Sequence, residues 1–304
     1  MCLLQILTTT SSGGGRTAQK NFRTDLAAEA RDAWLQGSEA ALSGVEESRE
    51  TRRGFEVQVL EIREKEAADI LCKPIGRYAT VSLDPLLRRE EDAFPRACAV
   101  LAEELQRQLA LPEEGGVLVV CLGNPDMTPD AVGPLAAGHL LVTAHLKRAM
   151  PEDFAAFRTV SVLRTGVLGT TGVESARLTE AVVSLVRPAA VVAVDALAAG
   201  DAARLCRAVQ ITDAGIVPGS GVGNARSALN RRTLGVPVVA VGVPTVVDAA
   251  ALCGSAENPA VAGMFVTPRD IDARVREAGR LVGCAVDLAL HRGLTLADVE
   301  ALLS

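Results

Sequence analysis

The stretch VLVVCLGNPDMTPDAVGP, residues 117–134, determines the fold class and contains the first candidate functional side chain. Its first six residues, 117–122, are all apolar and rich in β-branched side chains, which predicts a strand buried in a parallel sheet. Gly123 and Asn124 end this strand, and two prolines and two acids crowd the loop that follows. Ligands of open α/β sheets bind beyond the carboxyl ends of the strands, so this loop is a candidate site.

Strand and helix patterns alternate through the rest of the chain. Strands are predicted over 55–62, 77–83, 117–122, 158–163, 189–197, 208–212 and 236–243. Helices are predicted within 21–36, with Thr24 as the N-cap, and over 86–110, 130–147, 173–186 and 268–291, with a short one from 295. Residues 43–54 form a polar connection between the first helix and the first strand. The alternation predicts an α/β fold, a three-layer α/β/α sandwich with a mostly parallel sheet.

The length allows one large α/β domain or two smaller ones, and the continuous alternation of strands and helices favours one. The chain has 304 residues, which we divide into an N-terminal tail or appendage, 1–25, and a single α/β/α domain, 26–304. The net charge of −6 argues against nucleic-acid binding, which requires dense Lys and Arg. No run reaches the roughly 18 apolar residues of a membrane span. The seven cysteines form no CxxC pair, which is typical of a reducing, cytoplasmic compartment.

Two acids are the candidate catalytic groups. Asp130 follows the strand 117–122, and Asp195 ends the apolar run VVAVD. In a parallel sheet both acids lie at the same edge, where two carboxylates can share a proton or bind a metal. The alternative is that each acid only caps a helix or turn. Asp126, earlier in the loop, is interpreted as a turn residue.

The loop PGSGVGN, residues 218–224, is the second candidate site. Its glycines allow a ligand to approach the backbone, but it has neither the Lys of a phosphate loop nor the pattern of a dinucleotide-binding turn. A transition metal requires His or Cys near the acids. His139 and His145 are six residues apart in one predicted helix, and no His follows Asp195 before His291. We therefore predict no metal and no cofactor.

Six longer motifs follow one another along the chain: RTDLAAEA, GNPDMTPDAVGP, GVLGTTGVES, VDALAA, VQITDAGIVPGSGVGNAR and TLGVPVVAVGVPTVVDA. Together, and in this order, they resemble the germination proteases of spore-forming bacteria. The resemblance extends from about residue 22 to 250 and is weaker afterwards. It implies a fold similar to that of hydrogenase maturation proteases.

The resemblance also implies a function. Members of this family are endopeptidases that degrade small acid-soluble spore proteins during germination, through an atypical aspartic mechanism. The two catalytic acids correspond to Asp130 and Asp195, the same residues that the strand pattern selects. The family is made as a self-trimming zymogen, which makes 1–25 a pro-segment cut at Asp25–Leu26, where the sequence resembles a substrate cleavage site. A homotetramer in the cytoplasm of the forespore and spore core is implied as well.

The expected substrate contacts come from the glycine-rich loop. We predict that Gly219, Ser220, Gly221, Gly223 and Asn224 bind the substrate strand and that the loop offers backbone donors to it or to the oxyanion. The chain departs from the family in having Gly200 where Arg is usual. It also lacks a long segment that usually precedes the VTP sequence beginning at Val266.

Two alternative functions are retained from the sequence. One is an endopeptidase of the hydrogenase-maturation type, which recognises a metal in its substrate. Such enzymes have a His downstream of the second acid, and this chain has none in that position. The other is a binding protein of the same fold that has lost its activity.

Overall fold

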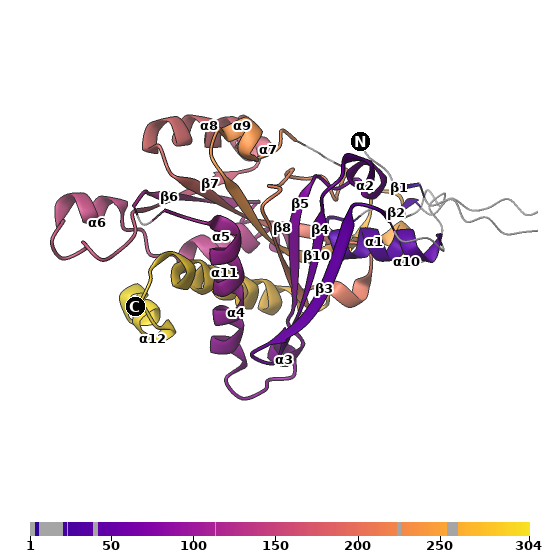
Figure 1. Cartoon of the computed structure of the whole chain (residues 1–304), viewed down its shortest axis with the longest axis horizontal. Helices are drawn as coiled ribbons and strands as arrows, with labels where there is room; N and C mark the ends of the chain where they lie inside the picture. Colours follow the sequence, from indigo (N-terminus) through magenta and orange to yellow (C-terminus); the bar gives the residue numbers. More distant parts are fainter. Residues whose placement is uncertain are drawn as a thin grey trace, which may run out of the picture.

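The computed structural model describes residues 4–5, 21–22, 24–38, 42–112, 114–223, 226–253 and 261–304. Most of the tail predicted over 1–25, and the predicted substrate residue Asn224, therefore lie outside the described residues. The described part is an α/β/α sandwich with helices on both faces of one large sheet (Figure 1). This architecture confirms the fold class that the alternating pattern predicts.

The central sheet has nine strands and changes character half-way across. The strand order is β3-β4-β5-β9-β10-β8-β6-β7, and β11 pairs with β10. Strands β7, β6, β8 and β10 run parallel, whereas β9, β5, β4 and β3 continue from β10 as an antiparallel half. The strands are β3 Val45–Arg52, β4 Phe55–Ile62, β5 Gly76–Ser82, β6 Val117–Leu122, β7 Val160–Gly166, β8 Ala190–Ala199, β9 Ala208–Thr212, β10 Val238–Asp248 and β11 Phe265–Val266; a separate short pair joins β1 Leu4–Gln5 to β2 Asn21–Phe22.

The helices form the two outer layers (Figure 1). Helices α4 (Ala93–Leu109), α5 (Val132–Ala136) and α11 (Ile271–Leu290) cover one face, and α8 (Ser175–Val186) and α9 (Arg231–Leu234) lie over the other. The remaining helices are α1 Ala27–Gln36, α2 Lys65–Leu71, α3 Asp84–Leu87, α6 Ala144–Ala149, α7 Leu168–Thr171, α10 Ala249–Cys253 and α12 Leu296–Leu303, with short 3-10 turns η1 Thr128–Asp130, η2 Ala137–His139 and η3 Ala202–Arg204.

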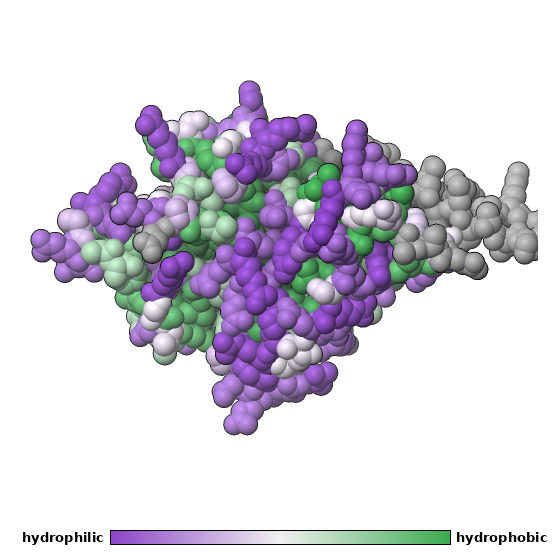
Figure 2. Space-filling model, in the orientation of Figure 1, coloured by the Kyte–Doolittle hydropathy of each residue, from purple (hydrophilic) through white to green (hydrophobic). Residues whose placement is uncertain are grey.

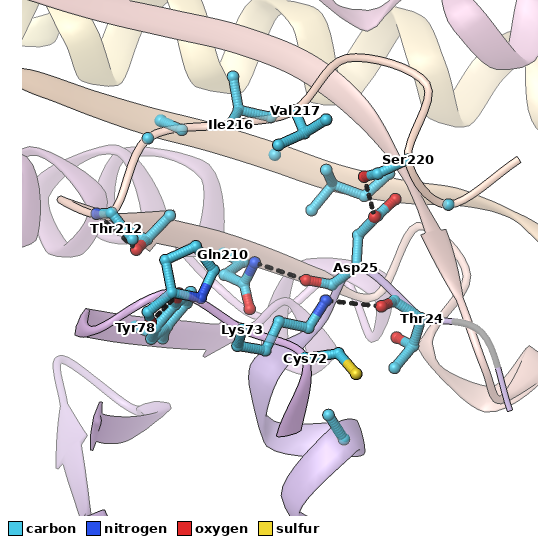
Figure 3. Close-up of a pocket in the computed structure, with 18 of the residues that line it drawn as sticks. Thr24, Asp25, Cys72, Lys73, Tyr78, Gln210, Thr212, Ile216, Val217 and Ser220 are labelled. Carbon is cyan, nitrogen blue, oxygen red and sulfur yellow. Dashed lines mark hydrogen bonds between the residues drawn. The ribbon is translucent and has the colours of Figure 1, made fainter. Parts of the chain in front are cut away.

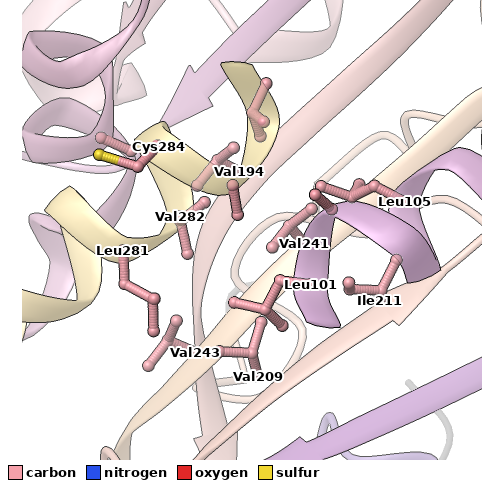
Figure 4. Close-up of a cluster of buried hydrophobic side chains, with 14 of the residues drawn as sticks. Leu101, Leu105, Val194, Val209, Ile211, Val241, Val243, Leu281, Val282 and Cys284 are labelled. Atoms are coloured by element: carbon pink, nitrogen blue, oxygen red, sulfur yellow. The ribbon is translucent and has the colours of Figure 1, made fainter. Parts of the chain in front are cut away.

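The larger core lies between the sheet and the α4–α11 pair. Leu101 of α4 and Leu281 of α11 are buried against valines of β8 and β10 such as Val194 and Val241 (Figure 4). These side chains alternate with residues that face the opposite layer, as a strand buried on both sides requires. The free thiols Cys98, Cys121, Cys206 and Cys284 are buried.

The polar connection predicted over 43–54 is wrong, because this segment contains the edge strand β3. The strand forms a hairpin with β4 through Arg53 and Gly54, both of which have positive φ, as in the tight turns that join twisted strands. Its side chains are largely exposed and charged, a composition that protects a sheet edge from pairing with other chains. Hydrophilic residues predominate over β3, α3 and α4 in Figure 2.

The single helix predicted over 130–147 is also wrong. The segment consists of η1, α5, η2 and α6, with an extended stretch before α6. Gly133 lets α5 lie against the sheet: a Cβ at this position would overlap the backbone of Leu122 in β6 and approach Val194 O of β8 to 2.7 Å. α5 is thus a short helix pressed directly onto the sheet. Thr24 does not cap α1, whose N-cap is Leu26.

Candidate active site

Asp130 is held by the loop that follows β6. Its Oδ2 accepts a hydrogen bond from the backbone N–H of Asn124, at 2.8 Å. Gly123, with φ of +110°, passes so close beneath Asp130 that a Cβ would overlap the Asp130 carbonyl oxygen. From β10, Thr245 Oγ1 donates to the carbonyl oxygen of Pro129 at 2.7 Å. The loop is therefore fixed both at the end of β6 and from β10, which lies on the far side of β8, and the Asp130 carboxylate makes no capping bond to α5.

Asp195 lies within β8, because the strand continues to Ala199 instead of ending at the acid as the sequence pattern suggests. The residue is 6% exposed, and its Oδ1 accepts from the N–H of Ala196. Burial is the main cause that raises the pKa of Asp195 well above its ordinary value, and the negative charge of Asp130 raises it further. Burial also raises the pKa of Asp130, against the opposing effect of the Asn124 hydrogen bond.

The structure brings the two acids into one pocket of about 710 Å³. This catalytic pocket, as we call it, lies beyond the carboxyl end of β6 and is lined by Asp130, Asp195, Gly166–Gly169 and the loop 216–222. A carboxyl group of raised pKa beside a second carboxylate can exist protonated near neutral pH, which is the requirement for one acid and one base in the same site. The arrangement is capable of activating water against a bound amide.

The glycine-rich loop contacts an N-terminal segment of the same chain, residues 24–29, which we call the docked segment or simply the segment. Ser220 Oγ donates to Oδ1 of Asp25 at 2.7 Å, and Gly221 lies where a Cβ would overlap the Asp25 carboxylate. Gly219 and Gly223 have positive φ. The backbone N–H groups of Ser220 and Gly223 donate to carbonyl oxygens within the loop. Among the described residues of this loop, the hydrogen bond to Asp25 therefore comes from the Ser220 hydroxyl.

Asp25 and Leu26, at the predicted trimming bond, are docked against β8. The Asp25 N–H donates to the carbonyl oxygen of Ala198 at 2.8 Å, and the Ala198 N–H donates to Asp25 Oδ2 at 2.9 Å. Leu26 is 1% exposed and packs in an apolar cluster with Leu197 and Val247. The Asp25 side chain lines the catalytic pocket, and its charge contributes to the raised pKa of Asp195.

Two residues that the sequence does not single out bind the same segment (Figure 3). Gln210, in β9, donates from Nε2 to the Asp25 carbonyl oxygen at 3.2 Å and accepts from the Ala27 N–H at 2.8 Å. Lys73 donates from Nζ to the carbonyl oxygen of Thr24 at 2.6 Å. The sequence signal for Gln210 is a polar residue in the middle of the apolar run AVQIT. No feature of the sequence around Lys73 indicates that it binds the segment.

The C-terminal end of the segment is bound through Glu29. Its Oε2 accepts from the N–H of Gly200 at 2.7 Å and its Oε1 from the N–H of Asp201 at 3.3 Å. Burial raises the pKa of Glu29, with the hydrogen bonds acting in the opposite direction. Since the backbone of Gly200 makes the contact, the departure from the family's usual Arg leaves this interaction possible.

The described residues offer neither a metal site nor a membrane span. Across the described ranges, no three or more His, Cys, Asp and Glu side chains are grouped so that they could hold a metal ion. This includes His291, which is buried at the end of α11 and whose two ring nitrogens have no hydrogen-bond partner. Within the same ranges, none of the helices combines the length and apolar character needed to cross a membrane.

Comparison with known proteins decides the family. The sequence profile described as germination protease matches residues 23–258. The chain belongs to the germination protease family. The germination protease of Clostridium perfringens strain SM101 is 33% identical over 323 residues, which cover 93% of this chain and 99% of the relative. Those of Caldanaerobacter subterraneus and Priestia megaterium are 35% and 41% identical over 320 and 246 residues, covering 93% and 77% of this chain and 98% and 66% of the relatives.

Membership of the germination protease family confirms the resemblance carried by the sequence motifs and, at the level of the family, the prediction of a protease. The matched region includes Asp25, both candidate catalytic acids and the glycine-rich loop. The germination proteases of Clostridium perfringens and Caldanaerobacter subterraneus each align with 93% of this chain and not only at isolated motifs.

Proposed function

We propose that the chain is an aspartic-type endopeptidase in which Asp130 and Asp195 together activate a water molecule. The observation that carries the proposal is that one pocket contains both acids, with a raised pKa at the buried Asp195 caused by burial and by the charge of Asp130. Two facing carboxylates that share one proton provide a base and an acid at the same pH.

The surroundings of the two acids suggest how the roles divide. Asp130 is the more exposed of the pair, and the Asn124 N–H stabilises its charged form, so it acts as the base that takes a proton from water. Asp195 is buried and retains its proton, which it gives to the nitrogen of the leaving peptide. The reaction is hydrolysis: water adds to the carbonyl carbon and the carbon–nitrogen bond breaks.

We propose further that the chain is a zymogen that trims its own N-terminus at Asp25–Leu26. Support comes from the position of this bond: Asp25 lines the pocket of the two acids and is hydrogen-bonded to β8 on both its backbone and its side chain. A segment held in the pocket also excludes other peptides from it. The uncut chain is therefore expected to be inactive toward substrates in solution.

The biological setting proposed from the family is spore germination. The substrates are small acid-soluble spore proteins, the location is the cytoplasm of the forespore and spore core, and the assembly is a homotetramer. Incubation of the trimmed chain with a small acid-soluble spore protein, followed by mass spectrometry of the fragments, tests the substrate. Light scattering of the purified protein tests the tetramer.

The decisive test of the mechanism is replacement of each acid. Asp130→Asn and Asp195→Asn should each lower self-trimming and substrate cleavage by at least about 1000-fold while the far-ultraviolet circular dichroism stays unchanged. Asp126→Asn is the matched control, since Asp126 is exposed in the same loop and its N–H bonds only to Asn124 Oδ1. Cleavage at the normal rate by either acid variant would show that the pair is not catalytic.

A further inference from the structure

Gln210 occupies a special place in the sheet. In the antiparallel ladder Gln210 of β9 pairs with Gly242 of β10, and Gly242 pairs in the parallel ladder with Asp195 of β8. Paired residues point to the same face of a sheet, so Gln210 and Asp195 share one face and are two strands, about 10 Å, apart. Gly242 between them has no side chain, and Leu197 fills the space above it.

The segment bound by Gln210 lies on this same face. Leu197 packs with Leu26, while Gln210 reaches across Leu26 to bond with the peptide groups on both sides of it. The Asp25 carbonyl oxygen that accepts from Gln210 Nε2 belongs to the bond proposed for trimming. The Asp25 carboxylate points instead to Ser220 and Ala198, and its charge is felt at Asp195.

A buried side-chain amide is costly unless its donor and acceptor are both satisfied. Gln210 is 5% exposed, and the hydrogen bonds of its amide go to the two backbone groups of the segment. When the segment leaves, this amide loses both partners. A second peptide with a carbonyl and an N–H at the same spacing would restore them, so the side chain is preorganised to bind extended peptide backbone.

We infer that Gln210 is a further catalytic residue of this site, which binds the carbonyl oxygen of the bond to be cut and holds that bond in front of the two acids. The inference rests on the proposed function. When water attacks the Asp25 carbonyl carbon and passes a proton to Asp130, the carbonyl electron pair moves onto the oxygen. Gln210 Nε2 donates to that oxygen and stabilises its negative charge. The carbon–nitrogen bond then breaks, and the Leu26 nitrogen takes the proton of Asp195.

The same geometry explains why the donor comes from the antiparallel half of the sheet. Asp130 follows β6 and Asp195 lies in β8, whereas Gln210 reaches the peptide from β9. Lys73 binds the carbonyl oxygen of Thr24, one residue nearer the N-terminus. The peptide is thus held at two successive carbonyl groups, and the second of them belongs to the bond to be cut.

The test compares Gln210→Met with Gln58→Met in the full-length chain. Met preserves the volume of Gln and removes its hydrogen bonds. Gln58 is the matched control because it lies in the same row of the sheet through Thr80, is 4% exposed, and donates to Glu47 instead of the segment. We expect Gln210→Met to slow self-trimming about 100-fold or more and Gln58→Met to change it less than about threefold.

A second readout does not depend on cleavage. Hydrogen exchange of the Ala27 amide in the uncut chain should speed up at least about tenfold in Gln210→Met and stay slow in Gln58→Met. Gln210→Glu retains the acceptor for Ala27 but has no donor when ionised, so at pH 8 it should keep Ala27 protected and still lose trimming. This variant decides the question if Gln210→Met does not fold.

The outcomes separate this inference from the proposed function. Normal trimming by Gln210→Met, or slow Ala27 exchange in that variant, overturns the role of Gln210. Normal trimming by Asp130→Asn combined with lost trimming by Gln210→Met overturns the assignment of the acids and supports Gln210. Loss of trimming in Gln58→Met to the same extent as in Gln210→Met would also overturn the inference, because the effect would then be a general disturbance of the sheet.

Discussion

Replacing Gly221 by Ala should undock Asp25 from the catalytic pocket. A Cβ at this position would overlap the Asp25 carboxylate and lie 2.5 Å from the Cβ of Ala198. Gly221 is not among the glycines with positive φ, so its backbone conformation accepts alanine and the effect is purely steric. The methyl group and the docked carboxylate cannot occupy the same space, so the carboxylate has to leave.

The size of the effect follows from the contacts that are lost. The docked carboxylate accepts from Ser220 Oγ and from the Ala198 N–H, at 2.7 and 2.9 Å. Each hydrogen bond to a charged group contributes about 1.5–3 kcal/mol, so the loss of both costs at least about 3 kcal/mol. The docked population then falls about 100-fold relative to the undocked one.

Self-trimming of Gly221→Ala should slow by a similar factor, because only a docked segment presents its bond to the acids. Mass spectrometry of the full-length chain measures this rate. Gly169→Ala is the matched control: Gly169 lines the same pocket, and a Cβ there meets nothing within 4 Å. Equal trimming rates in the two variants would refute the steric reasoning and mean that the loop moves aside without consequence.

Two further predictions concern stability. Leu26→Ala removes a buried side chain from its apolar cluster and should lower the free energy of unfolding by about 2–5 kcal/mol in urea titrations; no change would mean that the cluster around Leu26 does not hold the segment. Asp287, whose carboxylate accepts from the Leu141 N–H, has a pKa raised to about 8 by burial, so its stabilising effect is complete below pH 4 and is lost as the pH rises toward 8. In Asp287→Asn the free energy of unfolding should fall less between pH 4 and pH 8, and at pH 8 it should exceed that of the parent by at most about 5 kcal/mol. An unchanged dependence of the unfolding free energy on pH would contradict the raised pKa of Asp287.

The buried strands could be predicted from the sequence because they are apolar runs, as in β6, or alternate apolar and polar residues, as in β4. The bounds of β4, β6 and β9 coincide with the predicted ones, since each run ends at a polar or turn-forming residue. The charged strand β3 could not be predicted in this way. It is stabilised by pairing with β4 and by ion pairs such as Arg52–Glu104, which link residues far apart in the sequence.

The candidate acids could be predicted because parallel strands place their carboxyl ends at one edge. This rule led to Asp130 and Asp195, although Asp195 lies inside its strand and not at its end. For Asp25, only the family resemblance indicates a functional role. The contacts of Gln210 and Lys73 depend on which strand lies beside β10, and that order is a property of the folded sheet.

The change from parallel to antiparallel pairing at β10 has a consequence for how this enzyme could be altered. The acids belong to the parallel half, whereas Gln210 and the neighbourhood of Lys73 belong to the antiparallel half. Substitutions around β5 and β9 that spare Gln210 can therefore change which peptides are accepted without moving the two proposed catalytic acids. For protein engineering, the antiparallel half apart from Gln210 is the part to diversify in a library, with the parallel half kept constant.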